Sequence, residues 1–163
     1  METNTKQPEL FIKMTMAAWD AQNNSLTKLS AALTDEQLSK EIAPGRNSGV
    51  YLLGHLVAVN DAMFPLLGFG ESLFPQLENI FIKNPDKSGL EKPSATELKE
   101  FLQVINTKLT KAIQSTPVIG WFERHTAVSA EDFAKEPHRN KLNIIISRTN
   151  HMAYHLGQMA LLK

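Results

Sequence analysis

The chain has 163 residues, 17 lysines and arginines balanced by 17 aspartates and glutamates, and no cysteine. This length fits one compact domain, and the balanced charge provides no field that would attract nucleic acid or an anionic membrane, so we expect neither as a partner. Without cysteine there is no disulfide, no thiolate metal ligand and no cysteine nucleophile, so nitrogen and oxygen atoms must hold any metal.

The N-terminal residues METNTKQPELFIKM lack the basic segment and following apolar segment of a secretion signal. We find no run of about 18 apolar residues, the length that crosses a membrane. We therefore expect an unexported, cytoplasmic protein.

The first half of the chain carries the apolar spacing of two long helices. The first runs from Pro8 to about Leu33, with apolar side chains three, four and seven positions apart. A short connecting helix follows Thr34, which is a typical helix cap. The second long helix is predicted over residues 47–68, begins at a serine cap and is the most apolar of the set.

The second half begins with a long connection. Residues 68–93 hold six glycines and prolines, which predicts a loop with at most short turns. Residues 94–115 open with a Ser-x-x-Glu capping box and keep one apolar face, which predicts the third long helix. Residues 116–139 are irregular apart from a short turn at 129–135, and the fourth helix covers about 140–162.

Four amphipathic helices without strand-like alternation predict an all-α fold, a four-helix bundle. The connection between helices two and three is long enough to cross the bundle, so these two helices need not be antiparallel neighbours. We expect one domain over residues 1–163.

The fourth helix carries two histidines in the stretch NHMAYHLGQM, His151 and His155. At about 100° per residue they lie one turn apart and about 40° round the helix, near enough to share a ligand. Met-Ala-Tyr separates them, so the His-Glu-x-x-His pattern of zinc proteases is absent. On its own the pair fits a solvated surface as well as the floor of a wet cleft.

His55, in the stretch LLGHLV, has apolar neighbours at helical spacing and therefore points into an apolar face. Burying it without a partner would cost about 1–3 kcal/mol. The economical solution is that His55, His151 and His155 bind one divalent cation, as imidazoles do at about 2.0–2.1 Å. Three imidazoles leave a position open, as in catalytic centres. We expect zinc, with nickel as the alternative.

In these residues the sequence resembles the DinB/YfiT-like family of the DinB superfamily. The resemblance rests on the histidine of GHL, His55, and on the histidine pair followed by Gly-Gln in HMAYHLGQ, and it covers nearly the whole chain. It implies a single DinB-like four-helix-bundle domain with a long crossover between helices two and three, a three-histidine metal site and a homodimer. For activity it implies a metal-dependent S-transferase with a low-molecular-weight thiol such as bacillithiol as cosubstrate, a mycothiol-dependent isomerase, or a small-molecule hydrolase.

Three further residues are candidates to support the site or to touch a small-molecule substrate. Gln158, one turn beyond His155, could orient a histidine or a bound water, with a surface or dimer contact as an equal alternative. Tyr51, one turn before His55, could donate a hydrogen bond, and Arg148 could hold a carboxylate bidentately. The plainer interpretations are core packing for Tyr51 and a solvated helix surface for Arg148.

Other polar and aromatic residues carry less weight. Asp20 and Asp61 are the carboxylates expected near the interior, but Asp61 projects about 120° away from His55, which argues against it as a fourth ligand. Trp121 and Phe122 either roof the cleft or form a separate apolar cluster. We expect two histidines to be ordinary loop residues: His125 and His138.

Two classes of function therefore remain open. The first is a cytoplasmic metal-dependent enzyme, which the open coordination position favours. The second is a non-enzymatic helical-bundle module for binding or dimerisation, with structural or adventitious metal, which the lack of an evident general base keeps open. The two long loops are expected to set the specificity for any substrate.

Overall fold

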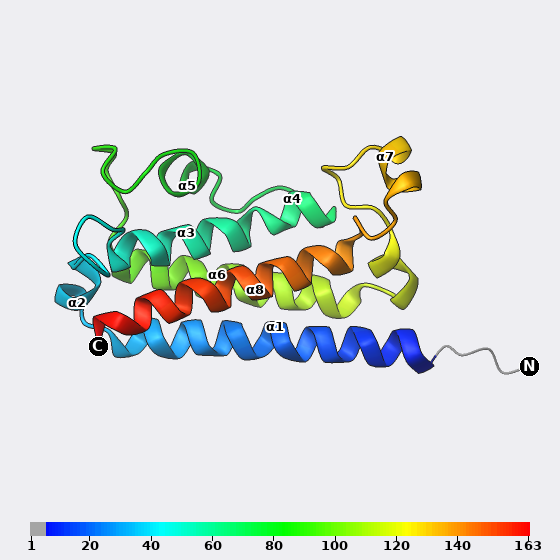
Figure 1. The fold of residues 1–163 in the computed structure, drawn as a ribbon, viewed down its shortest axis with the longest axis horizontal. Coiled ribbons are helices and arrows are strands. Elements are labelled where there is room, and N and C mark those ends of the chain that lie inside the picture. The colour runs from blue at the N-terminus through cyan, green and yellow to red at the C-terminus, as the bar shows by residue number, and fades with distance from the viewer. Residues whose placement is uncertain (1–5) are drawn as a thin grey trace, which may run out of the picture.

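The structure is a computed structural model, which describes residues 6–163. Within these residues the regular structure is helical and contains no strand, which confirms the all-α class. The longest helices that pack together are α1 (Lys6–Ala32), α3 (Gly49–Asp61), α6 (Ala95–Ser115) and α8 (Lys141–Met159). They lie alongside one another, with α1 and α8 running in one direction and α3 and α6 in the other (Figure 1). The expectation about secretion rests partly on residues 1–5, which lie outside the described residues.

Polar side chains start the helices where the sequence predicts them. In α2 (Asp35–Ser39), α3, α6, α7 (Ala130–Lys135) and α8, the residue before the helix accepts a backbone N–H of the first turn. These cap residues are Thr34, Ser48, Ser94, Ser129 and Asn140. Each cap contributes roughly 1 kcal/mol, because it satisfies an N–H that the helix leaves free.

The second long helix is interrupted, whereas the sequence predicted one helix over residues 47–68. α3 ends at Asp61, and α4 (Met63–Leu67) follows after a turn at Ala62. Pro65 has no N–H to donate to the carbonyl of Asp61, which instead receives the Ser72 hydroxyl at 3.4 Å. The missing backbone hydrogen bond explains the break.

The connection after α4 contains a helix of its own, α5 (Gln76–Phe81), where the sequence predicted at most short turns. This helix packs on α3 on the side away from α1 (Figure 1). The Phe81 side chain is fully buried, and a Cβ at Gly54 would overlap its ring. The glycine of the GHL stretch therefore permits the close approach of α5 to α3.

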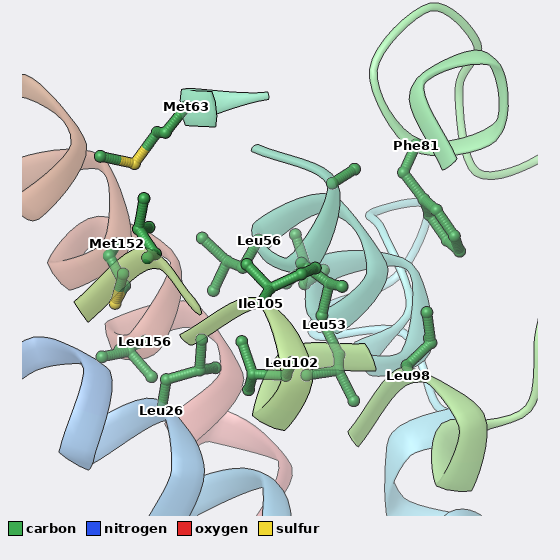
Figure 2. Packing of buried hydrophobic residues seen from close by; sticks show 14 of the residues in the cluster. Leu26, Leu53, Leu56, Met63, Phe81, Leu98, Leu102, Ile105, Met152 and Leu156 are labelled. Carbon is green, nitrogen blue, oxygen red and sulfur yellow. The ribbon is translucent and has the colours of Figure 1, made fainter. Parts of the chain in front are cut away.

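The apolar core lies between the four long helices, and its side chains interlock in Figure 2. Its labelled members include Leu26, Leu53, Leu56, Leu102, Ile105, Met152 and Leu156. By length and composition Gly49–Leu67 is apolar enough to cross a membrane, but 72% of the apolar window is buried inside the protein. Packing against the other helices accounts for its apolar character. Two short 3-10 turns complete the fold, η1 (Val118–Phe122) and η2 (Ala160–Leu162).

Candidate metal centre

Three histidines from two helices meet between α3 and α8. His55 lies on α3, His151 and His155 lie on α8, all are half-buried, and their ligand nitrogens lie within 4.8 Å of one another. Nε2 of His151 is 3.1 Å from Nε2 of His55 and 3.0 Å from Nε2 of His155. The structure therefore brings together the three residues that the sequence predicted to converge.

In His55 and His155, the ring nitrogen that faces away from the cluster, Nδ1, is hydrogen-bonded to a carbonyl oxygen. Nδ1 of His55 lies 2.7 Å from the backbone oxygen of Phe81, and Nδ1 of His155 lies 2.7 Å from Oε1 of Gln158. Because a carbonyl oxygen only accepts, each Nδ1 carries the hydrogen and donates it. The Nε2 atoms of both rings are thus left with a lone pair that faces the cluster.

This donor set fits a divalent metal ion. A tetrahedral zinc ion with Zn–N distances of about 2.0–2.1 Å separates its nitrogen ligands by about 3.3 Å. The two Nε2–Nε2 distances of 3.1 and 3.0 Å are close to that separation. The rings also fan out, with angles of 69° between His55 and His151 and 88° between His151 and His155.

The surroundings favour the neutral form of His55 and His151, which is the form that binds metal. Burial, followed by the positive charges of His155, His55 and Arg148, lowers the pKa of His151 to about 4. Burial also lowers the pKa of His55, although the hydrogen bond to Phe81 opposes that shift. Both rings are therefore unprotonated at neutral pH.

Tyr51 lies behind His55 and helps to fix the carbonyl that orients it. The Tyr51 side chain is buried, and its ring lies parallel to the His55 ring, with 6.4 Å between centroids and 10° between planes. Its hydroxyl donates to the backbone oxygen of Asn84 at 2.6 Å and that of Phe81 at 3.4 Å. The hydroxyl of Tyr51 is thus engaged with the chain's own backbone.

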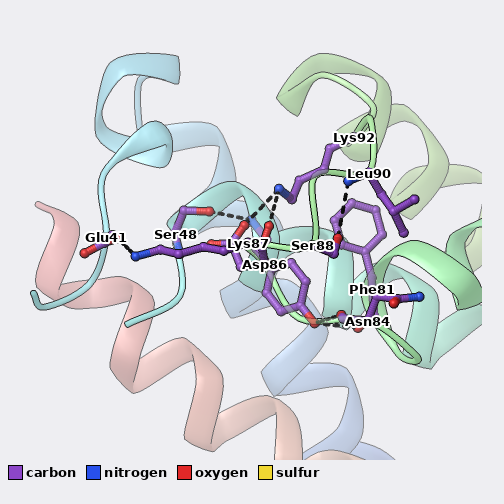
Figure 3. Close-up of polar contacts among 10 residues, drawn as sticks. Glu41, Ser48, Phe81, Asn84, Asp86, Lys87, Ser88, Leu90 and Lys92 are labelled. Carbon is purple, nitrogen blue, oxygen red and sulfur yellow. Dashed lines mark hydrogen bonds and ion pairs between the residues drawn. The ribbon is translucent and has the colours of Figure 1, made fainter. Parts of the chain in front are cut away.

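A polar contact ties the segment after α5 to the start of α3 (Figure 3). Asp86 accepts the backbone N–H of Ser48 at 2.7 Å and lies 3.0 Å from the Lys92 ammonium. Burial acts to raise the pKa of Asp86, but the hydrogen bonds from Ser48 and Lys92 outweigh it and leave the pKa lowered. Since Ser48 caps α3, this contact anchors the connection after α5 to the N-terminal end of the helix that carries His55.

Residues 18–159 match the family model described as the DinB superfamily, which is most of the chain. The chain belongs to the DinB superfamily. Proteins of this superfamily generally bind metal, and the three clustered histidines of this member provide a place for a metal ion. No curated protein matches this chain.

On α8 of this DinB-superfamily protein, the structure places the remaining candidates beside the histidines. Gln158 is half-buried, accepts from His155 and donates to the hydroxyl of Tyr154 at 3.3 Å. Arg148 is half-buried three positions before His151, and its Nε is buried without an acceptor among the described residues. The Arg148 side chain is therefore less exposed than a solvated helix surface would leave it.

Neither candidate carboxylate joins the histidine cluster. Both oxygens of the buried Asp61 accept backbone N–H groups, from Leu73 and Phe74, each at 2.8 Å. Asp61 therefore holds the loop after α4. Asp20 is exposed, not interior as expected: it lies on α1 at a groove between α1 and α6, where partial desolvation raises its pKa.

The aromatic pair and the loop histidines lie in other surroundings. Trp121 is buried in the main core and packs edge-on against Phe69, while 36% of the Phe122 side chain is exposed. His125 is buried, and this burial lowers its pKa. His138 is exposed, and neither of these two histidines belongs to the cluster.

Sequence reasoning missed the backbone oxygen of Phe81, because any residue can offer a backbone acceptor. One signal was available in Gly54, since a glycine inside an apolar helix often marks close approach of another segment.

Proposed function

We propose that this protein is a metal-dependent enzyme in which His55, His151 and His155 bind one divalent metal ion through Nε2. One observation carries the proposal: the three Nε2 atoms converge while Nδ1 of His55 and of His155 is committed to a carbonyl oxygen. Zinc is the first candidate, because tetrahedral nitrogen coordination suits it, and nickel is the second.

The reaction that we propose is transfer of a low-molecular-weight thiol cosubstrate to a small electrophilic substrate, with hydrolysis of a small molecule as the second candidate. Three protein ligands leave at least one coordination position open. A metal ion held by the three histidines would supply a Lewis acid that lowers the pKa of a thiol or of water at the open position. The chain's own contribution is orientation, because Phe81 and Gln158 fix two of the three rings.

For the whole molecule we propose one cytoplasmic domain over residues 1–163, without a nucleic-acid or membrane partner. The side-by-side arrangement of α1, α3, α6 and α8 supports a four-helix bundle (Figure 1). The parallel directions of α3 and α6 support the long crossover between them. We also propose a homodimer, supported by apolar side chains on α1 that are more than half exposed: Leu10, Phe11 and Met14.

The metal content of untagged protein tests the site. Wild type is expected to hold one equivalent of zinc or nickel by elemental analysis, and alanine variants of His55, His151 and His155 are each expected to lose it. His138→Ala removes an exposed histidine outside the cluster and is the matched control. Wild type without stoichiometric metal, or variants that keep it, would overturn the proposal.

Turnover then separates an enzyme from a binding module. Metal-loaded protein is assayed with a panel of thiols and an aryl halide, and separately with a panel of small esters. We expect turnover that a chelator and His151→Ala both abolish. If the protein holds stoichiometric metal but turns over neither the thiols with the aryl halide nor the esters, the alternative is favoured, a binding or dimerisation module with structural metal. The exposed apolar side chains of α1 provide a surface for such a module.

A further inference from the structure

Arg148 shares a face of α8 with the two histidines, and among residues 6–163 no carboxylate forms an ion pair with it. Its Nε is buried without a hydrogen-bond acceptor among the described residues. Burial lowers the pKa of Arg148. The side chain therefore carries a partly buried positive charge that the described part of the chain does not neutralise.

A second donor on the same face also lacks an acceptor. Nδ1 of His151 is buried and has no partner among the described residues. When Nε2 of His151 faces a metal ion, Nδ1 carries the hydrogen and becomes a donor. Of the three buried side-chain nitrogens without a partner in residues 6–163, two thus lie three positions apart on α8. The third, in His125, belongs to a loop histidine outside the cluster.

One kind of ligand would satisfy both Nε of Arg148 and Nδ1 of His151. A guanidinium stays protonated in a protein, so its burial is unfavourable unless an anion pairs with it. A donor without an acceptor requires an acceptor. Carboxylate and phosphate groups supply negative charge and acceptor oxygens, and they match the planar fork of arginine.

We propose that Arg148 binds an oxyanion, so that the substrate or the thiol cosubstrate of this protein carries a carboxylate or phosphate group. The inference rests on the proposed function and narrows its substrate class to small anionic molecules. Arg148 lies three residues, a rise of about 4.5 Å along α8, before His151, so the anionic group of the ligand would bind on the same face of α8 as His151 and His155. Arg148 is accordingly a specificity residue of the site.

Inorganic phosphate and acetate are the probes, titrated separately into metal-loaded protein in an anion-poor buffer. Binding is followed by melting temperature and by NMR shifts of α8. Arg148→Gln is expected to weaken binding roughly ten- to hundred-fold, and Arg148→Lys less, because lysine keeps the charge without the fork. Arg139→Gln is the control, since Arg139 already pairs with Glu136 at 3.1 Å. The stronger of the two probes identifies the oxyanion.

Equal binding of both probes by wild type and Arg148→Gln would overturn the inference, and so would wild type that binds neither. Metal content is measured in every sample. Wild type without metal would overturn the proposed function, whereas the effect of Arg148→Gln on probe binding by that protein still decides the role of Arg148. Arg148→Met is a second variant, for the case that Arg148→Gln does not fold. Without added anions, the melting temperature of Arg148→Met is expected to exceed that of wild type, because the substitution removes an unpaired charge. A lower melting temperature would contradict the inference.

Discussion

The two helices that form the histidine cluster orient their histidines in different ways. On α3, His55 is oriented by the backbone oxygen of Phe81, 26 positions along the chain. On α8, His155 is oriented by Gln158, which lies three positions away on the same helix. One half of the site thus depends on how α5 packs, and the other half depends on its own helix.

This difference predicts that changes on the two helices affect the stability of the fold and the metal affinity differently. A change on the α3 side displaces packed segments, so it should lower the free energy of unfolding and the metal affinity together. A change on the α8 side alters a contact within one helix, so it should lower metal affinity while the fold is kept. Four substitutions test this contrast.

Gly54→Ala should have the largest effect. The added Cβ would overlap the buried ring of Phe81, so α5 must move off α3 and withdraw the oxygen that orients His55. Overpacking of this kind lowers stability by about 3 kcal/mol. Urea unfolding and a competitive metal titration should both show the loss. A variant with wild-type stability and metal affinity would show that α5 does not hold His55.

Gln158→Ala should weaken metal binding without unfolding the protein. Removing a residue that orients a metal-ligating histidine typically lowers metal affinity 10- to 100-fold. A chelator competition assay measures the change, and the melting temperature of the metal-free protein should match wild type. Gln114→Ala, on the exposed surface of α6, is the control. If Gln158→Ala and Gln114→Ala bind metal with equal affinity, Gln158 does not orient His155 for metal binding.

Tyr51→Phe should lower stability by about 1 kcal/mol, because a net hydrogen bond contributes about that much. The change removes the hydroxyl that donates to Asn84 and Phe81 and keeps the ring beside His55. Tyr154→Phe is the comparison on α8, where 65% of the tyrosine is exposed and its hydroxyl makes one exposed hydrogen bond, from Gln158 at 3.3 Å. If both variants unfold at the same urea concentration, the hydroxyl of Tyr51 does not anchor the connection.

Gly157→Ala should have the smallest effect, and in the opposite direction. A Cβ at Gly157 meets no described atom within 4 Å, and alanine favours a helix over glycine by about 0.5–1 kcal/mol. Thermal unfolding should therefore rise slightly while metal affinity stays unchanged. A loss of metal affinity would show that the α8 half of the site also depends on close packing.

Local sequence signals predicted the helices well, because each signal acts within one turn. Ser94 with Glu97 forms the predicted capping box, and Asn140 begins α8 at the predicted position. The break at Ala62 was missed because the apolar pattern continues through it, although Pro65 removes a backbone donor there. The short helix α5 was missed because its glycine- and proline-rich surroundings predict a loop.

The convergence of the three histidines could be predicted, because a histidine on an apolar helix face needs a polar partner and two histidines one turn apart can share one. The contacts that orient these histidines were only partly predictable. Gln158 lies on the same face of α8 as His151 and His155, so helical spacing predicted that it could contact His155. The oxygen of Phe81 depends on tertiary packing, and the burial of Arg148 depends on what lies across from α8.

The most direct test of the account is a crystal structure of metal-loaded protein, with the metal located by its anomalous scattering. We predict one metal ion bound to Nε2 of His55, His151 and His155 at about 2.0–2.1 Å. Nδ1 of His55 should still donate to Phe81, as in the structure described here. A metal ion bound elsewhere, or bound through Nδ1 of these rings, would contradict the account.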